Sequence, residues 1–171
     1  MRWKRALLFG STLAALAALL APTLALGAKP GTPLDLALCA PGQNTFSVTV
    51  DNGYFPLPVD QQWVYQGREQ GQSIGLQITV LSETENFYSG RRTVTTRVVE
   101  EVEWEDTNQN GVIDEGENLI EVSRNFFAQT QDGTVCYFGE EVDIYENGVV
   151  VSHEGAWRAD DRGNAPGARS R

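Results

Sequence analysis

The stretch SIGLQITV, residues 73–80, decides the fold class of this chain. Its apolar residues stand at every second position, at Ile74, Leu76, Ile78 and Val80. A period of two sends alternate side chains to opposite faces of an extended chain, whereas a helix needs apolar spacings of three and four. The stretch therefore predicts a β-strand with one buried face.

The same alternation recurs through most of the chain, and no long stretch shows helical spacing. Strong hairpin-turn sequences stand at 131–133 and 146–148, and the two prolines of 54–59 predict an irregular edge or crossover. We therefore expect an all-β fold, an antiparallel meander that forms a sandwich or an open barrel. The further alternating runs are 45–50, 62–65, 94–105, 120–128 and 134–155.

The N-terminus has the parts of a secretory signal peptide. Arg2, Lys4 and Arg5 form a basic start, and a long apolar run leads to the small residues of Ala25-Leu26-Gly27. We predict a signal helix over 1–27 that is cleaved, and hence a secreted, periplasmic or cell-surface protein. An apolar run of about 20 residues can also span a bilayer, so an uncleaved membrane anchor is the alternative.

The mature chain divides into three parts. Residues 28–44 hold Pro and Gly around a short apolar run, and we expect an exposed lead-in there. Residues 45–158 carry the alternating pattern and predict one β domain. Residues 159–171 contain no apolar residue larger than Ala or Pro, so we expect a disordered tail.

The acidic charge argues against two classes of partner. The chain has 13 basic and 23 acidic residues. Cleavage after residue 27 removes three basic and no acidic residues, so 10 basic against 23 acidic residues leave a net charge of −13. That charge repels nucleic acid and anionic membrane surfaces, and we expect neither as a partner of the mature form. It is compatible with cations or with simple solubility.

Two cysteines, Cys39 and Cys136, permit a single pairing. Export to an oxidising compartment would allow them to form a disulfide across a long loop, and two buried thiols are the alternative. Neither cysteine lies in a CxxC pattern or beside a histidine, which argues against redox or nucleophilic chemistry.

Three stretches of the chain resemble a family of uncharacterised exported bacterial proteins: YFPLPVDQQWVYQG (54–67), TTRVVEEVEWED (95–106) and VSRNFFAQTQDGTVCYFGEEVDIYENGVVVSHEGAWRA (122–159). The resemblance implies a β-rich secreted domain and no established activity. Relatives of this kind join the strands around 106 by a short turn and continue past Trp157 with more β-rich sequence. The resemblance therefore implies an insertion near 106 and predicts a C-terminally truncated sheet.

The inserted stretch DTNQNGVIDEGE, residues 106–117, matches the 12-residue calcium loop of EF-hands. Alternate positions of that loop supply hard oxygen ligands, Gly111 permits its sharp bend, and Ile113 would pin it to apolar neighbours. An Asx-rich hairpin turn is the alternative. The assigned oxygen ligands are Asp106, Asn108, Asn110, the Val112 carbonyl, Asp114 and Glu117.

The flanks of this loop limit what calcium would do. EF-hand loops join two helices and work in pairs, whereas this chain has one loop between sequences typical of strands. With only three carboxylates among the ligands, we expect binding in the extracellular range, about 10⁻⁴ to 10⁻³ M. The prediction is a structural calcium ion in a secreted, non-enzymatic β domain.

Other patterns support fewer conclusions. A G-x-S-x-G match at 71–75 lacks the strand before it and the helix after it that a hydrolase needs, and His153 is the only histidine, so no enzyme is predicted.

The glutamates of 101–105 are expected on a solvated strand face, with attraction of cations as the alternative. An extracellular ligand- or carbohydrate-binding module, with incidental calcium, is the competing function. Its aromatic face would comprise Trp63, Tyr65, Trp104, Tyr137 and Trp157.

Overall fold

The computed structural model describes residues 36–161 and 164–167. The predicted signal peptide and the first part of the lead-in lie outside these residues. Within the described ranges, no helix is long and apolar enough to cross a membrane.

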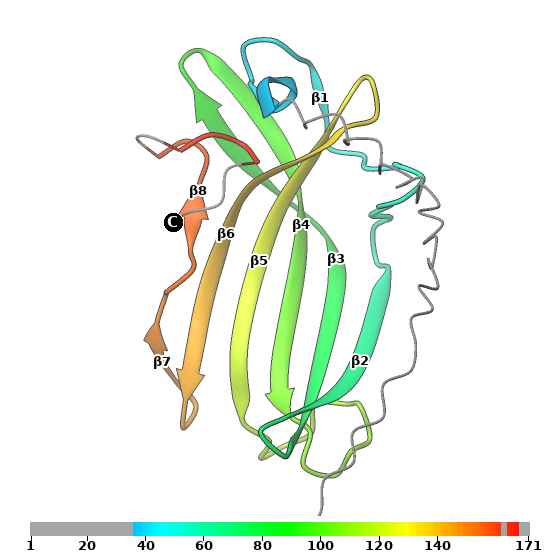
Figure 1. Cartoon of the computed structure of the whole chain (residues 1–171), viewed down its shortest axis with the longest axis vertical. Coiled ribbons are helices and arrows are strands. Elements are labelled where there is room, and N and C mark those ends of the chain that lie inside the picture. The colour runs from blue at the N-terminus through cyan, green and yellow to red at the C-terminus, as the bar shows by residue number, and fades with distance from the viewer. Residues whose placement is uncertain (1–35, 162–163, 168–171) are drawn as a thin grey trace, which may run out of the picture. The chain divides into compact units, whose positions relative to one another are not determined.

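One antiparallel sheet makes up the fold (Figure 1). Six strands follow one another in the order β2-β3-β4-β5-β6-β7, while β1 pairs with β5 and β8 pairs with β6. The sheet is open. Its strands are β1 (Phe46–Ser47), β2 (Gln62–Glu69), β3 (Gln72–Ser89), β4 (Arg92–Glu105), β5 (Leu119–Thr130), β6 (Val135–Glu146), β7 (Val149–Ser152) and β8 (Trp157–Arg158).

The predicted all-β antiparallel meander is confirmed, and its sheet is not closed. Residues 73–80 lie inside β3, which extends well beyond them. The turn between β3 and β4 lies at 90–91, because the two strands pair as far as Ser89 and Arg92. The turn of 146–148 is as predicted: Asn147 and Gly148 both have positive φ, as a two-residue hairpin loop requires.

The strand expected over 45–50 is much shorter in the structure. Only β1 pairs with the sheet, opposite Gln129 and Thr130. Val50 is buried, but it packs with Leu57 against the sheet instead of extending it. Val50 is thus buried because its segment crosses the face of the sheet. Alternation of apolar residues in the sequence does not distinguish such a segment from a paired strand.

The main core lies at the end of the sheet where the β3–β4 and β5–β6 turns are found, which we call the disulfide end. Aromatic rings dominate it: Phe87 contacts Phe126 and Phe138 with ring centroids 5.4 and 5.6 Å apart. Arg158 covers this cluster, with its guanidinium 4.4 Å from the Phe87 centroid. The buried members are Cys39, Phe87, Val94, Val98, Phe126, Ala128, Cys136 and Phe138.

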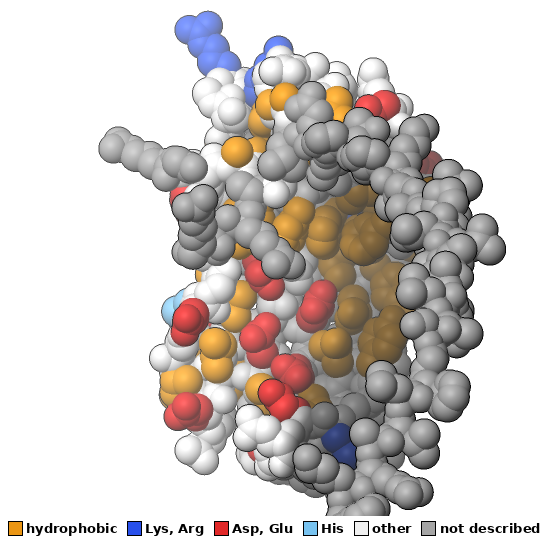
Figure 2. All heavy atoms as spheres, in the orientation of Figure 1, with side chains coloured by type: hydrophobic (Ala, Val, Ile, Leu, Met, Phe, Trp, Pro, Cys, Tyr) orange, Lys and Arg blue, Asp and Glu red, His pale blue; other side chains and the backbone are white. Residues whose placement is uncertain are grey.

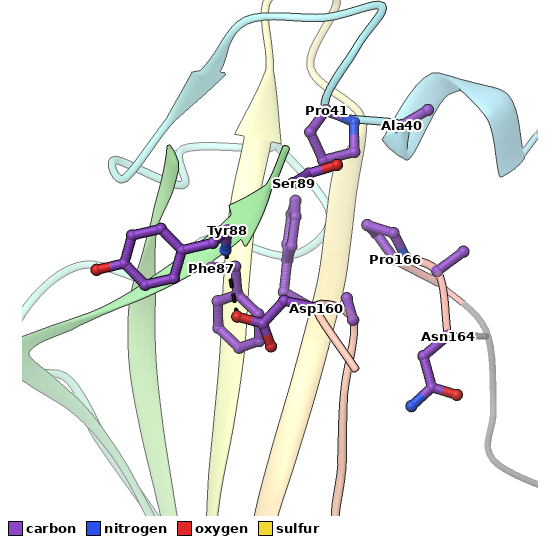
Figure 3. Close-up of a pocket in the computed structure, with 11 residues that line it drawn as sticks. Ala40, Pro41, Phe87, Tyr88, Ser89, Asp160, Asn164 and Pro166 are labelled. Carbon is purple, nitrogen blue, oxygen red and sulfur yellow. Dashed lines mark hydrogen bonds between the residues drawn. The ribbon is translucent and has the colours of Figure 1, made fainter. Parts of the chain in front are cut away.

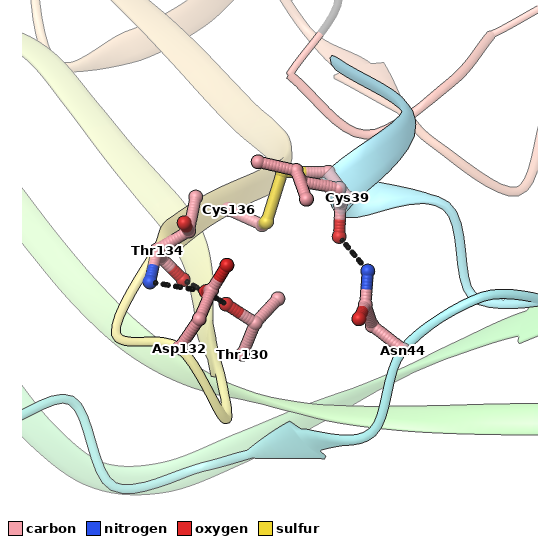
Figure 4. Close-up of a disulfide and its surroundings, with 7 residues drawn as sticks. Cys39, Asn44, Thr130, Asp132, Thr134 and Cys136 are labelled. Atoms are coloured by element: carbon pink, nitrogen blue, oxygen red, sulfur yellow. Dashed lines mark hydrogen bonds between the residues drawn. A yellow bond between two sulfur atoms is a disulfide. The ribbon is translucent and has the colours of Figure 1, made fainter. Parts of the chain in front are cut away.

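The predicted disulfide is present and joins the lead-in to this core (Figure 4). Cys39 ends a short 3₁₀-helix, η1 (Leu36–Cys39), and its Cα lies 5.6 Å from the Cα of Cys136 on β6. Cys39 is 5% exposed, and the Asn44 amide donates a hydrogen bond to the Leu38 carbonyl. The described part of the lead-in is therefore joined to the core at Cys39.

The described part of the predicted tail contacts β6. The N–H of Ala159 donates to the Phe138 carbonyl at 2.8 Å, and that of Gly167 donates to the Tyr137 carbonyl at 2.7 Å. Backbone groups make both of these contacts. A pocket lies where this segment meets η1 and the β3–β4 hairpin (Figure 3), and the Asp160 carboxylate at its wall accepts a hydrogen bond from the Tyr88 N–H.

Candidate calcium-binding loop

The loop 106–117 connects β4 to β5 at the opposite end of the sheet, which we call the loop end. Its base is closed by a hydrogen bond from the Glu105 N–H to the Asn118 carbonyl at 2.9 Å. The Asp106 N–H donates to the Ser73 carbonyl on β3 at 3.0 Å. As expected, the segments on both sides of the loop are strands.

Asp106 is the fixed point of the loop. It is 1% exposed, and its carboxylate accepts hydrogen bonds from the Gln66 side chain at 2.7 Å, the Gly111 N–H at 3.0 Å and the Asn110 N–H at 3.1 Å. The Gln66 hydrogen bond is the main cause that lowers the pKa of Asp106, and the backbone N–H groups add to it against the opposing effect of burial. Asp106 is thus held ionised and oriented toward the loop.

Gly111 has the geometry that position 6 of a calcium loop needs. Its φ is +73°, in the region that glycine enters without steric cost. A Cβ at this position would also lie 3.3 Å from the Gln66 side chain. The same glutamine therefore contacts both the first ligand and the bend of the loop.

Three of the predicted ligands are joined by their own hydrogen bonds. The side-chain amides of Asn108 and Asn110 each donate to the same Asp114 oxygen at 2.7 Å. The amide oxygen of Asn108 accepts the Asn110 N–H, and that of Asn110 accepts the Val112 N–H. The N–H groups of the two amides carry partial positive charge, which offsets the negative charge of the Asp114 carboxylate.

Glu117 closes the loop from its other end. One carboxylate oxygen accepts the Thr107 N–H at 2.8 Å, and the other accepts the Asp114 N–H at 3.1 Å. Glu117, the last predicted ligand, is therefore hydrogen-bonded to the backbone of Thr107, which follows the first predicted ligand. It is also hydrogen-bonded to the backbone of Asp114, the fifth predicted ligand. Sequence reasoning assigned these residues as ligands from their spacing alone, and it missed Gln66, which lies 40 residues before Asp106 and becomes its neighbour only through strand pairing.

The donor set fits a hard divalent cation in its chemistry, since it consists of carboxylate and amide oxygens. The geometry of the loop as described is held by hydrogen bonds: within the described ranges, no three His, Cys, Asp or Glu side chains gather closely enough to hold a metal ion. Val112 and Ile113 are 58% and 39% exposed, so Ile113 does not pin the loop to an apolar surface as expected.

The glutamates of β4 are not all on a solvated face, which corrects that expectation. Glu101 and Glu103 are half-buried, and burial, together with the negative charge of Glu121, raises the pKa of each. Glu100 has the opposite orientation, where Arg124 pairs with it at 3.2 Å.

The predicted aromatic face does not form one exposed row. Trp104 is fully buried on one side of the sheet, packed over Gly75. The pairing register puts Trp63, Tyr65, Tyr137 and Trp157 on the other side. There the Tyr137 ring meets Trp157 edge to face, with centroids 5.1 Å apart, while Tyr65 is 53% exposed on the edge strand.

Two other residues that the sequence patterns singled out, Ser73 and His153, lie within or next to strands. Ser73 of the G-x-S-x-G match lies within β3 opposite Arg68, so no strand-to-helix turn presents it. His153 follows β7, and its ring Nδ1 lies 2.9 Å from an Asp143 carboxylate oxygen.

Comparison with known proteins found no matching family, no similar curated protein and no similar solved structure.

Proposed function

We propose that loop 106–117 binds one calcium ion, and that the ion stiffens the loop end of an exported, non-enzymatic β domain. The observation that supports the proposal is the hydrogen-bond network of the loop: Asp106, Asp114 and Glu117 are linked through backbone N–H groups and amides that the loop itself supplies. The disulfide supports export, because such bonds persist in oxidising compartments.

Each residue has a defined part in this proposal. Asp106, already fixed by Gln66, would be the anchoring carboxylate, and Glu117 would close the shell with both oxygens. The amides of Asn108 and Asn110 would present oxygen instead of N–H to the centre, which releases Asp114 to bind the ion directly or through water. Calcium would thus replace the two amide hydrogen bonds that now neutralise Asp114.

Calorimetric titration of the full chain with calcium tests the proposal, beside the variant Glu117→Gln. We expect heat from the parent with a dissociation constant of about 10⁻⁴ to 10⁻³ M and binding at least about tenfold weaker in the variant. At ten times the dissociation constant, calcium should stabilise the parent by about 1.4 kcal/mol. The matched control Glu115→Gln removes an exposed carboxylate of the same loop that is not among the ligands and should bind as the parent does. A parent that gives no heat at millimolar calcium would refute the proposal.

A further inference from the structure

One face of the sheet combines apolar side chains and carboxylates, and the described segment with Val50 and Leu57 covers only part of it. We call it the inner face. It is defined by Trp63, Leu76, Ile78, Glu101, Glu103, Glu121 and Glu140, which the register brings to the same side of β2 to β6.

Figure 2 shows a hollowed face on which hydrophobic side chains gather over β2 and β3, with Asp and Glu side chains beside them over β4 to β6. The segment that contains Val50 and Leu57 covers the part of the inner face around Val80 and Val99. Leu76 and Ile78 are only half-buried, and Ile78 and Trp63 border the cluster of Val50 and Leu57. The most extensive contacts among the described strands are between neighbours in the sheet.

An apolar sheet face is normally buried against another layer, because its exposure to water costs free energy. The inner face is long enough for a helix. The seven residues of β3 from Ile74 to Val80 extend over roughly 20 Å, the length of about 14 helical residues, and the segment with Val50 and Leu57 covers the Val80 end. Four strand spacings from β2 to β6 amount to about 19 Å, enough for a helix about 10 Å wide and its side chains.

The charge of the inner face determines the character of that helix. In the described residues, none of the ion pairs involves Glu101, Glu103, Glu121 or Glu140. Arg97 is on the same side of the sheet, but its guanidinium donates to three carbonyls of the irregular part of β3. The four carboxylates therefore repel one another in a half-buried setting, and burial raises the pKa of Glu101, Glu103 and Glu140.

We infer that the inner face is a docking surface for a basic amphipathic helix of a partner protein. Leucine-like side chains of the helix would lie on Leu76, Ile78 and Trp63. Lysine or arginine side chains along one flank would reach the carboxylates of β4 to β6 and relieve their mutual repulsion. One helix would then cover the apolar residues of the inner face and also pair with its carboxylates.

A synthetic 14-residue helix of Leu and Lys, with Leu at helical spacing, is the probe for the full chain. We expect it to bind, as followed by fluorescence anisotropy, and to bind more weakly as salt increases. A peptide of the same composition with shuffled order should bind at least about tenfold more weakly, since one face of 14 residues can no longer be apolar. Equal binding of the two peptides would overturn the inference.

Two variants locate the site. Glu101→Gln/Glu103→Gln/Glu121→Gln should lower affinity for the helix by about tenfold or more, as expected for desolvated charge pairs that lose one partner. The control Glu146→Gln/Glu154→Gln/Asp161→Asn removes the same charge from exposed positions and should change affinity by no more than about twofold. Equal losses in the two triple variants would overturn the inference, as would concentration-dependent self-association through this face, measured by sedimentation.

Discussion

Different kinds of interaction stabilise the two ends of the sheet. The disulfide end has a core of buried aromatic and aliphatic side chains, a covalent link to the lead-in and a C-terminal segment hydrogen-bonded to β6. The loop end combines one buried indole, Trp104, with polar contacts, chiefly the hydrogen bonds of Asp106 and Glu117. Apolar burial and a covalent bond need no ligand, whereas a polar loop can exchange its hydrogen bonds for an ion. Stability and ion binding are thus expected at opposite ends of one sheet.

Loss of the disulfide should have the largest effect. Cys39 and Cys136 are 97 residues apart, and in the chain-entropy account a bridge closing a loop of about 100 residues stabilises by about 4–5 kcal/mol. We expect Cys39→Ser/Cys136→Ser to lose about that much in urea unfolding. Calcium affinity should not change, because the loop is at the other end. A loss below about 1 kcal/mol would show that the two ends do not differ in this way.

Gly75→Ala should have the next largest effect and tests packing at the loop end. A Cβ there would lie 2.2 Å from the Trp104 ring, so the indole or β3 must move. We expect a loss of about 1–3 kcal/mol, the usual cost of overpacking, with a shift in tryptophan fluorescence. Gly67→Ala is the control, because its Cβ would meet nothing within 4 Å. Equal stability of the two variants would contradict a tightly packed Trp104.

Gln66→Ala should weaken calcium binding and depends on the proposed function. Residues that orient a metal ligand typically change affinity by about 10- to 100-fold, and we expect the low end because Asp106 keeps its backbone hydrogen bonds. Gln62→Ala is the control, since that amide bonds to Thr79 on the same strand pair and not to the loop. If the parent binds calcium and Gln66→Ala binds equally well, Asp106 needs no support from β2.

Neutralisation of the inner-face carboxylates should have the smallest effect on stability. A raised folded-state pKa means that stability is fully present below the ordinary carboxyl pKa and is lost as pH rises through the raised value. Glu101→Gln/Glu103→Gln should therefore raise the Tm at pH 7 by roughly 1–3 °C and leave it unchanged near pH 3. The nearby groups that titrate are Glu69, Glu121 and Glu140. A Tm gain that is the same at both pH values would exclude this electrostatic origin.

The strands and turns of the meander were predictable because they follow from local chemistry. Alternation marks β3 from Ile74 to Val80, and Asn147-Gly148 marks a turn whose backbone few other residues adopt readily. The two-residue β1 and the anchored tail were not predictable in the same way. Burial of Val50 and the hydrogen bonds of Ala159 depend on which distant strand lies beside them.

The sequence by itself determined an antiparallel all-β chain, the single cysteine pair and the spacing of the predicted oxygen ligands in 106–117. These depend on residues within one strand, one turn or one loop. Only the tertiary structure decided that Gln66 supports Asp106, that Glu100 pairs with Arg124, and that glutamates from three strands share a face with Leu76 and Ile78. The reason is strand register: it determines which residues of distant segments lie opposite one another, and no single segment contains that information.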